Sequence, residues 1–391
     1  MTNMTGMWLY NLNIVLPDGM IERGALRIAG EWIAEIHDTA APQGMAGRLV
    51  DGAGLTLIPG LIDMHGDMIE QELEPRPGVQ LPIPVAIAEL DKRLAACGVT
   101  TAYAGISFWE PQSARYRQRS AARARELTAA IHVLRDELLV DLRVHARYEV
   151  STPVVRPALQ EALDAGDVHL LSLMDHTPGQ GQYRDLQRHE AMIAQFFGSD
   201  NAAPPPLDND EMQLARWRSA GDLVDRARSR GVTIASHDDD TAAKVALMAA
   251  MGVTLSEFPV TMEAAETARR LSMTVAMGAP NALRGSSHSG NLSALDALQA
   301  GYVDMLAADY APAAMLHAVG TIIDAGLLPL HIAINLVSAG PAAALGLHDR
   351  GRIAVGQRAD FALIDNRRPM RVHGTIRNGT PIYWDATLAG R

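Results

Sequence analysis

Short apolar segments alternate with longer helical segments through the middle of the chain, and this alternation restricts the fold more than any other feature. Helical spacing of apolar residues separates most of these segments, as in residues 85–98 and 113–138. The apolar segments are residues 60–65, 99–106, 140–150, 168–176, 232–240, 252–260, 273–281 and 303–312. Parallel strands need a crossover, usually a helix, between them. Eight such units predict an α/β fold, a (β/α)8 TIM-like barrel.

Both ends of the chain have a different pattern, in which strand-like runs are joined by turns. Residues 9–38 contain three such runs, and residues 359–384 contain three more. We therefore expect one small β-sandwich domain, built from residues 1–57 and 351–391 together. Residues 58–350 would form the barrel, and the proline-rich stretch 199–211 would be a loop within it.

Charge and cysteine content restrict the partners and the compartment. The 391 residues carry 34 basic and 45 acidic side chains, a net charge of −11, which argues against nucleic-acid binding. Cys97 is the single cysteine, so no disulfide forms within the chain, as suits a reducing compartment. The first residues lack the basic start of a signal peptide, and no run is apolar enough to span a bilayer. We expect a cytoplasmic protein without a membrane or nucleic-acid partner, with homo-oligomerisation left open.

Polar residues follow the strand-like segments at the end where barrel enzymes carry their active sites. The first strand ends in His65-Gly66-Asp67, and alternation along a strand would put both side chains on one face. Taken alone, this could be a polar loop cap. Further strand ends add Glu149, Asp175, His176, His237, Asp238, Asp239, Asp240 and Asp309.

Histidine and carboxylate side chains at five strand ends predict a metal centre that activates water. Asp309, on the last strand, fits a proton carrier between water and a leaving group. The aspartates at 238–240 are expected to include the N-cap of the next helix. Lys244, on that helix, is expected to be solvated.

A second signal is the segment MGAPNALRGSSHSGN, which starts at Met277. Its cationic and hydroxyl side chains precede a helix expected to begin near Asn291, an arrangement typical of an anion site. The candidate phosphate-binding residues are Arg284, Ser286, Ser287 and His288. An ordinary glycine-rich loop with a helix cap is the alternative. Arg76, just after the first strand, is a second candidate cation or a surface arginine.

These segments resemble the amidohydrolase superfamily, and within it the family of α-D-ribose 1-methylphosphonate 5-triphosphate diphosphatases. The resemblance covers nearly the whole chain and is carried in order by LIPGLIDMHGD, EPRPGV, LLSLMDHTPGQGQY, ASHDDDT, EFPVTMEAAE, MGAPNALRGSSHSGN and DYAPAAML. It implies a metal-dependent hydrolase that releases pyrophosphate from a phosphorylated sugar. The implied cofactor is one or two divalent ions per chain, Zn²⁺ or Mn²⁺.

The resemblance also implies the site residues. The metal positions carry over to His65, Asp67, Glu149, His176, His237 and Asp309, with His237 and Asp309 also catalytic. Many amidohydrolases bridge two metals with a modified lysine, but Lys92 and Lys244 both fall in predicted helices. Glu149 is therefore the candidate bridge, and a salt bridge from Glu149 to Arg143 or Arg147 is the alternative.

Two other functions remain open from the sequence. The same metal centre serves an amidase or a deaminase that cleaves a C–N bond. A catalytically inactive scaffold is the other, but it would be expected to lose ligands, whereas here the set is complete.

Overall fold

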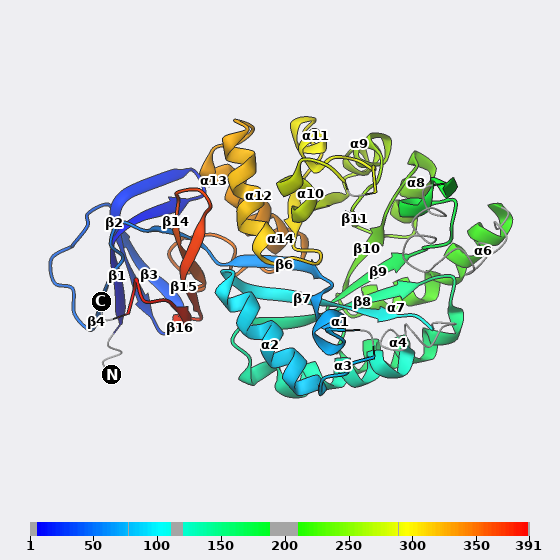
Figure 1. Cartoon of the computed structure of the whole chain (residues 1–391), viewed down its shortest axis with the longest axis horizontal. Coiled ribbons are helices and arrows are strands. Elements are labelled where there is room, and N and C mark those ends of the chain that lie inside the picture. The colour runs from blue at the N-terminus through cyan, green and yellow to red at the C-terminus, as the bar shows by residue number, and fades with distance from the viewer. Residues whose placement is uncertain (1–5, 77, 111–119, 188–209, 288, 390–391) are drawn as a thin grey trace.

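The computed structural model describes residues 6–76, 78–110, 120–187, 210–287 and 289–389. A barrel makes up most of it, and a smaller β domain lies at one side (Figure 1). The proline-rich stretch predicted as a loop falls almost entirely outside the described residues, which resume at Asp210.

The barrel sheet contains eight parallel strands in chain order, as the sequence predicts. They are β6 (Leu61–Gly66), β7 (Val99–Phe108), β8 (Asp141–Glu149), β9 (Leu170–Met174), β10 (Thr233–His237), β11 (Leu255–Glu257), β12 (Thr274–Gly278) and β13 (Met305–Ala307). Most are buried on both faces, because helices cover the outside and side chains fill the inside. A bridge between Gly66 and Asp309 closes the sheet from β6 to the end of β13.

Helices surround the barrel and present their apolar faces to the strands (Figure 1). In α2, the buried residues Ile87, Leu90 and Leu94 recur every three or four positions. The α-helices are α1 (Met68–Leu73), α2 (Ile83–Ala96), α3 (Ala121–Leu134), α4 (Arg156–Ala165), α6 (Asp210–Ser219), α7 (Gly221–Ser229), α8 (Ala242–Ala250), α9 (Met262–Arg270), α10 (Ala279–Arg284), α11 (Ala294–Gln299), α12 (Ala313–Asp324), α13 (Leu330–Ala333) and α14 (Ala339–Ala344). Single 3-10 turns are η2 (Arg135–Glu137), η3 (Pro153–Val155), η4 (Gly181–Tyr183) and η5 (Ile334–Val337).

The small domain combines both ends of the chain, as predicted. Its strands are β1 (Met7–Leu16), β2 (Gly19–Ala29), β3 (Trp32–His37), β4 (Arg48–Asp51), β5 (Thr56–Pro59), β14 (Phe361–Asp365), β15 (Arg371–Arg377) and β16 (Thr380–Trp384). They hydrogen-bond in one continuous sheet, in which β5 lies between β1 and β14, and they share one apolar core. The boundary predicted after residue 57 falls inside β5, which leads directly into β6.

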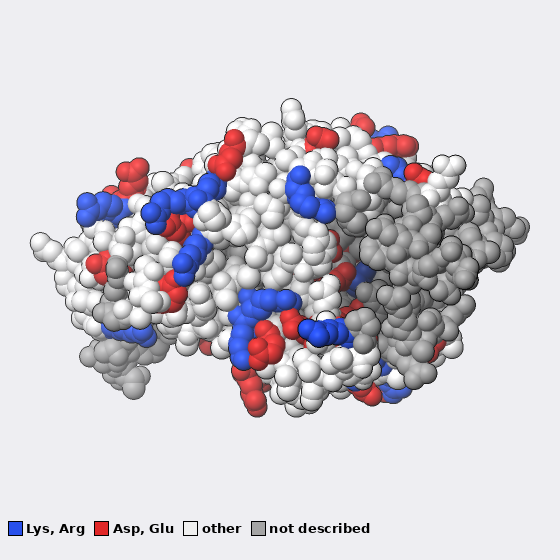
Figure 2. Space-filling model, in the orientation of Figure 1, with Lys and Arg blue, Asp and Glu red and all other residues white. Residues whose placement is uncertain are grey.

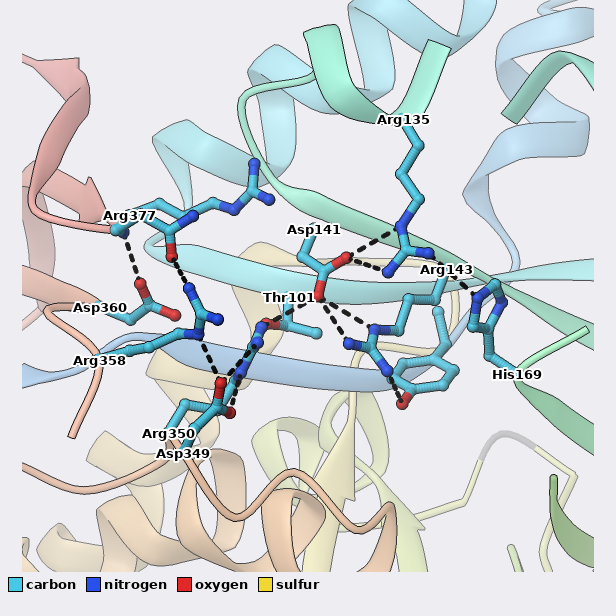
Figure 3. A network of polar contacts seen from close by, with 12 residues as sticks. Thr101, Arg135, Asp141, Arg143, His169, Asp349, Arg350, Arg358, Asp360 and Arg377 are labelled. Atoms are coloured by element: carbon cyan, nitrogen blue, oxygen red, sulfur yellow. Dashed lines mark hydrogen bonds and ion pairs between the residues drawn. The ribbon is translucent and has the colours of Figure 1, made fainter. Parts of the chain in front are cut away.

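A network of ion pairs connects the small domain to the end of the barrel at which the parallel strands begin (Figure 3). Asp141, the first residue of β8, accepts hydrogen bonds from Arg135, Arg143 and Arg350 at 2.9–3.0 Å. Arg350 also contacts Asp349, which pairs with an arginine of the segment leading to β14. Because β8 ends at Glu149, this network lies at the opposite end of the strands from the predicted site.

The visible surface carries charges of both signs, scattered between uncharged residues (Figure 2). Among the described residues, no helix is both long and apolar enough to cross a bilayer.

Candidate metal centre

The polar side chains that end the barrel strands meet in a cavity of about 460 Å³. The strand-end residues in its wall are His65, Asp67, His176, His237, Asp238 and Asp309. A larger cavity of about 620 Å³ lies against the small sheet, and none of the predicted site residues lines it. The predicted chemistry therefore belongs to the smaller cavity at the barrel mouth.

His65, Asp67 and Asp309 form a first triad, with one ligand atom of each within 4.8 Å of the others. His65 Nε2 lies 3.1 Å from Asp67 Oδ1. The Asp67 amide donates to the Asp309 carbonyl at 2.7 Å, and the Asp309 amide donates to the His65 carbonyl at 2.8 Å. These backbone bonds join β6 to the end of β13, so the closure of the barrel itself assembles this triad.

His176, His237 and Asp238 form a second triad. The Nε2 atoms of the two histidines face Asp238 Oδ2, at 4.0 Å from His176 and 3.6 Å from His237. Asp238 has a φ of 52°, a conformation that few residues other than glycine adopt without strain. Its amide donates to the Glu257 carbonyl at 2.9 Å, which holds this conformation and aims the carboxylate at both histidines.

Two expectations for the segment after β10 were wrong. Lys244 is not solvated, because Nζ donates to the carbonyls of His237 at 2.8 Å and Asp238 at 3.3 Å. The N-cap of α8 is Thr241, whose side chain accepts from the Lys244 amide, and not one of the preceding aspartates. Asp239 instead accepts hydrogen bonds from two buried serine hydroxyls. These residues support the second triad from behind.

Glu257, the last residue of β11, orients one histidine of each triad. Its buried carboxylate lies 2.7 Å from His65 Nδ1 through one oxygen and 2.7 Å from His237 Nδ1 through the other. Ser172 donates a third hydrogen bond at 2.9 Å. Burial alone would raise the pKa of Glu257, but His65 and His145 hold it well below the usual value. Because an ionised carboxylate only accepts, both histidines donate through Nδ1 and direct Nε2 to the cavity.

Glu149, at the end of β8, contacts His176 and neither of the arginines considered for it. Its two oxygens accept hydrogen bonds from His176, one from the ring Nδ1 at 2.7 Å and one from the backbone amide at 3.1 Å. Arg143 and Arg147 pair with aspartates instead, so the salt-bridge alternative is wrong. In this arrangement Glu149 lies behind His176 and leaves that ring's Nε2 for a cation.

The polar atoms that face the cavity fit a divalent cation. Asp238 Oδ2 is buried and has no hydrogen-bond partner within the described part of the chain, and the buried His65 Nε2 has only its 3.1 Å contact with Asp67 Oδ1. A buried polar atom without a partner is unfavourable, and ligation to a cation would remove that cost. Imidazole nitrogen and carboxylate oxygen together suit borderline ions such as Zn²⁺.

Electrostatics at the first triad also favour a cation. Burial lowers the pKa of His65, but Glu257 and Asp67 outweigh it and raise the pKa to about 10. Burial and the neighbouring Asp67 raise the pKa of Asp309 to about 6. Carboxylates therefore dominate the site, and a cation that replaces the His65 proton would neutralise part of their charge.

The predicted phosphate-binding residues are only partly brought together. Arg284 and Ser287 line the cavity. Ser286 and Arg76 are exposed and lie outside its wall, Arg76 on the loop that follows α1. His288 lies outside the described residues.

The loop that carries Arg284 is held by its own side chains. Asn281 donates to the Leu292 carbonyl at 2.9 Å and accepts from the Ala294 amide at 3.0 Å. The following helix, α11, begins later than predicted, because Ser293 caps it. This helix therefore has the ordinary cap that was the alternative interpretation. Arg284 and Ser287 reach the cavity from the loop before it.

Sequence reasoning missed two buried charged residues of the site, Glu257 and Arg147. The signal for Glu257 was present, since it is a polar residue that ends an apolar strand like the others. Arg147 stands within β8, where a buried arginine has no local signature. Asp175 was noted, but it accepts hydrogen bonds from Thr177 and lies in neither triad.

Comparison with known proteins places this site in a family. Residues 219–382 match the amidohydrolase family. The chain is 34% identical, over 94% of its length and 97% of the relative's, to the α-D-ribose 1-methylphosphonate 5-triphosphate diphosphatase of Escherichia coli (strain K12). It is 27% identical to the 5-methylthioadenosine/S-adenosylhomocysteine deaminase of Halobacterium salinarum, over 91% of this chain and 83% of that one.

Solved structures show the same fold. The 5-methylcytosine deaminase of Klebsiella pneumoniae liganded with phosphonocytosine superposes with a TM-score of 0.67 at 16% identity, over 97% of this chain and 98% of that one. Likeness at this identity concerns the fold, whereas the 34% relative spans nearly all of both sequences. The chain therefore belongs to the amidohydrolase family of hydrolases.

Proposed function

We propose that this protein hydrolyses α-D-ribose 1-methylphosphonate 5-triphosphate to the 5-phosphate and pyrophosphate. The observation that carries the proposal is the presence of both triads and two arginines, Arg147 and Arg284, in one cavity. Cation ligands beside guanidinium groups suit a polyphosphate better than an uncharged amide. The E. coli relative named for this reaction supports the same substrate.

The metal would be one or two Zn²⁺ or Mn²⁺ ions. His65, Asp67 and Asp309 would hold one ion, and His176, His237 and Asp238 would hold the other, with Glu149 and Glu257 orienting the histidines. When bound, such an ion polarises phosphoryl oxygens and lowers the pKa of water.

The protein's own groups would bind and orient the substrate and move the proton. Asp309, with its pKa raised to about 6, is able to accept a proton from the attacking water and return it to the leaving group. Arg284 and Ser287, at the loop after β12, would hold the outer phosphates away from the triads. This separation favours attack at the α-phosphorus, with pyrophosphate as the leaving group.

Product analysis tests the proposal. Metal-loaded protein should convert the ribose triphosphate to equal amounts of sugar monophosphate and pyrophosphate, and a chelator should abolish the reaction. In ¹⁸O-labelled water, attack at the α-phosphorus puts the label in the sugar phosphate and none in pyrophosphate. Orthophosphate as the product, or label only in pyrophosphate, would contradict this route.

Hydrolysis of a C–N bond is the second candidate function. The deaminase relative and the deaminase structure favour it, because the same fold serves that chemistry. Ammonia release from methylthioadenosine or cytosine derivatives, measured on the same metal-loaded preparation, separates the two candidates.

A further inference from the structure

Arg147 is a buried cation in the floor of the metal cavity. It extends from β8, is 7% exposed, and lines the cavity together with His65, Asp67 and Asp309. Its Nη1 donates to Asp67 Oδ1 at 2.5 Å. Among the described residues that line the cavity, the only other arginine or lysine is Arg284, which is exposed.

Most of the hydrogen-bonding capacity of Arg147 is unused. A guanidinium offers five N–H donors in a planar fork. Asp67 takes one of them, and the Nε of Arg147 is buried without a hydrogen-bond partner in the described part of the chain. An unpaired buried charged donor is more unfavourable than a neutral one. A ligand in the cavity that supplies several acceptor oxygens would satisfy this arginine.

The neighbouring strand leaves space for this arginine. A Cβ at Gly105 of β7 would lie 2.8 Å from Asp67 Oδ1 and 3.1 Å from Arg147 Cδ. Any larger residue at position 105 would therefore displace the pair. The arginine also lies beside the carboxylate of Asp67, and a guanidinium stays charged in a protein at any working pH.

Neutralising the charge of Asp67 does not by itself explain why Arg147 is buried at this position. Asp67 belongs to the first triad, where a cation would share its carboxylate. The unused N–H donors of Arg147 beside that cation can bind a further anion, and a phosphoryl group supplies one with several oxygens.

We infer that Arg147 binds the phosphoryl group that is attacked, next to the triads, whereas Arg284 binds the outer phosphates. This deepens the proposed function and rests on it. The guanidinium stays protonated throughout and forms no covalent bond, so it is a catalytic residue by contact with the reacting group. It would pair with equatorial phosphoryl oxygens as negative charge develops on them. A substrate with an amide at this position would leave Arg147 unpaired.

Binding measurements on the metal-loaded protein test this assignment. The probes are ribose 5-phosphate, whose phosphate would occupy the Arg147 site, and pyrophosphate, which would occupy the Arg284 site. Arg147→Met should weaken ribose 5-phosphate binding about ten- to a hundredfold, the range for a lost charged hydrogen bond, and leave metal content unchanged. Arg284→Met, the matched control, should weaken pyrophosphate binding and leave ribose 5-phosphate binding close to that of the unmodified protein.

A conservative variant separates charge from geometry. Arg147→Lys keeps a cation beside Asp67 but loses the planar fork, so ribose 5-phosphate binding should still fall, with metal content intact. Loss of metal in both Arg147 variants would overturn the inference and make Arg147 a support for Asp67. Unchanged ribose 5-phosphate affinity in Arg147→Met would overturn it as well.

The inference and the proposed function fail in different ways. If pyrophosphate is released but ribose 5-phosphate binding does not depend on Arg147, the inference alone is wrong. If no phosphoanhydride is cleaved but the binding does depend on Arg147, the proposed substrate is wrong and the phosphoryl site stands.

Discussion

At the scale of single residues, the metal centre depends on how its histidines are oriented. Glu257 lies 2.7 Å from the Nδ1 atoms of both His65 and His237, and Glu149 lies 2.7 Å from that of His176. Each histidine can bind a cation through Nε2 only if Nδ1 carries the proton. Two carboxylates that are not themselves directed at the cavity centre therefore decide whether the triads bind metal.

Glu257→Gln is expected to weaken metal binding about ten- to a hundredfold without unfolding the protein. The carboxamide offers one acceptor and one donor, so it matches Nδ1–H on one histidine only. The other histidine must accept at Nδ1 and carry its proton on Nε2, where the cation would bind. Competition with a coloured chelator measures affinity, and ¹⁵N NMR of the imidazoles reports the tautomers. Full affinity with unchanged tautomers would contradict the assigned role.

Glu149→Gln provides the comparison. Among the three histidines it changes the partner of His176 alone, so one metal position should weaken, and the tautomers of His65 and His237 should stay as they are. Damage to both triads would indicate that Glu149 bridges two ions, as the family resemblance implies.

At the scale of elements, the two ends of the barrel have separate tasks. The carboxyl ends of the strands carry the triads, whereas the opposite end carries the Asp141 network (Figure 3). Burial would raise the pKa of Asp141, but Arg143 and Arg135 hold it well below its usual range. Asp141 is buried and the side chain of Arg350 is 8% exposed, so this largely covered pair joins the barrel to the segment that leads into the small domain.

Asp141→Asn is expected to destabilise the protein by about 3 kcal/mol, because it removes the buried carboxylate that Arg135, Arg143 and Arg350 share. Urea denaturation measures the free energy of unfolding. Metal content should not change, since the network is remote from the triads. Asp365→Asn is the control: its partner Arg367 is 89% exposed, and the expected loss is below about 1 kcal/mol. A loss from Asp141→Asn as small as the loss from the control would contradict a stabilising role for the network.

At the scale of the whole molecule, two histidines outside the triads are held in the neutral form by their surroundings in the fold. Burial lowers the pKa of His145 to about 3, and burial together with Arg135 lowers that of His169 to about 4. The Val144 amide donates to His169 Nδ1 at 3.2 Å, which also favours the neutral ring. In the unfolded chain both would bind a proton near pH 6.5.

Stability should therefore fall as the pH is lowered from 6.5 to about 4. In that window the unfolded chain binds a proton at His169 that the folded chain does not. The loss from this residue is at most about 3 kcal/mol. His169→Asn keeps an acceptor for Val144 but cannot be protonated, so its stability should depend less on pH. Urea titrations at several pH values measure this, and parallel curves for the two proteins would contradict it.

The sequence by itself determined the strands, their order and the polar residues at their ends. Local periodicity carries that information, because a buried parallel strand needs a short apolar run and a crossover. His65, Asp67, His176, His237 and Asp309 were all found in this way, and each lines the cavity.

Only the tertiary structure decided which polar groups meet. Glu257 contacts His65 from 192 positions away, and Arg147 contacts Asp67 from 80 positions away. No local pattern encodes such pairs, because they arise when the barrel closes and brings strand ends together. The same closure leaves Arg76 outside the cavity, although only the short helix α1 separates its loop from the first barrel strand. The local sequence pattern decides which strand or helix a residue belongs to. Only the packing of strands and helices decides which partner its side chain contacts.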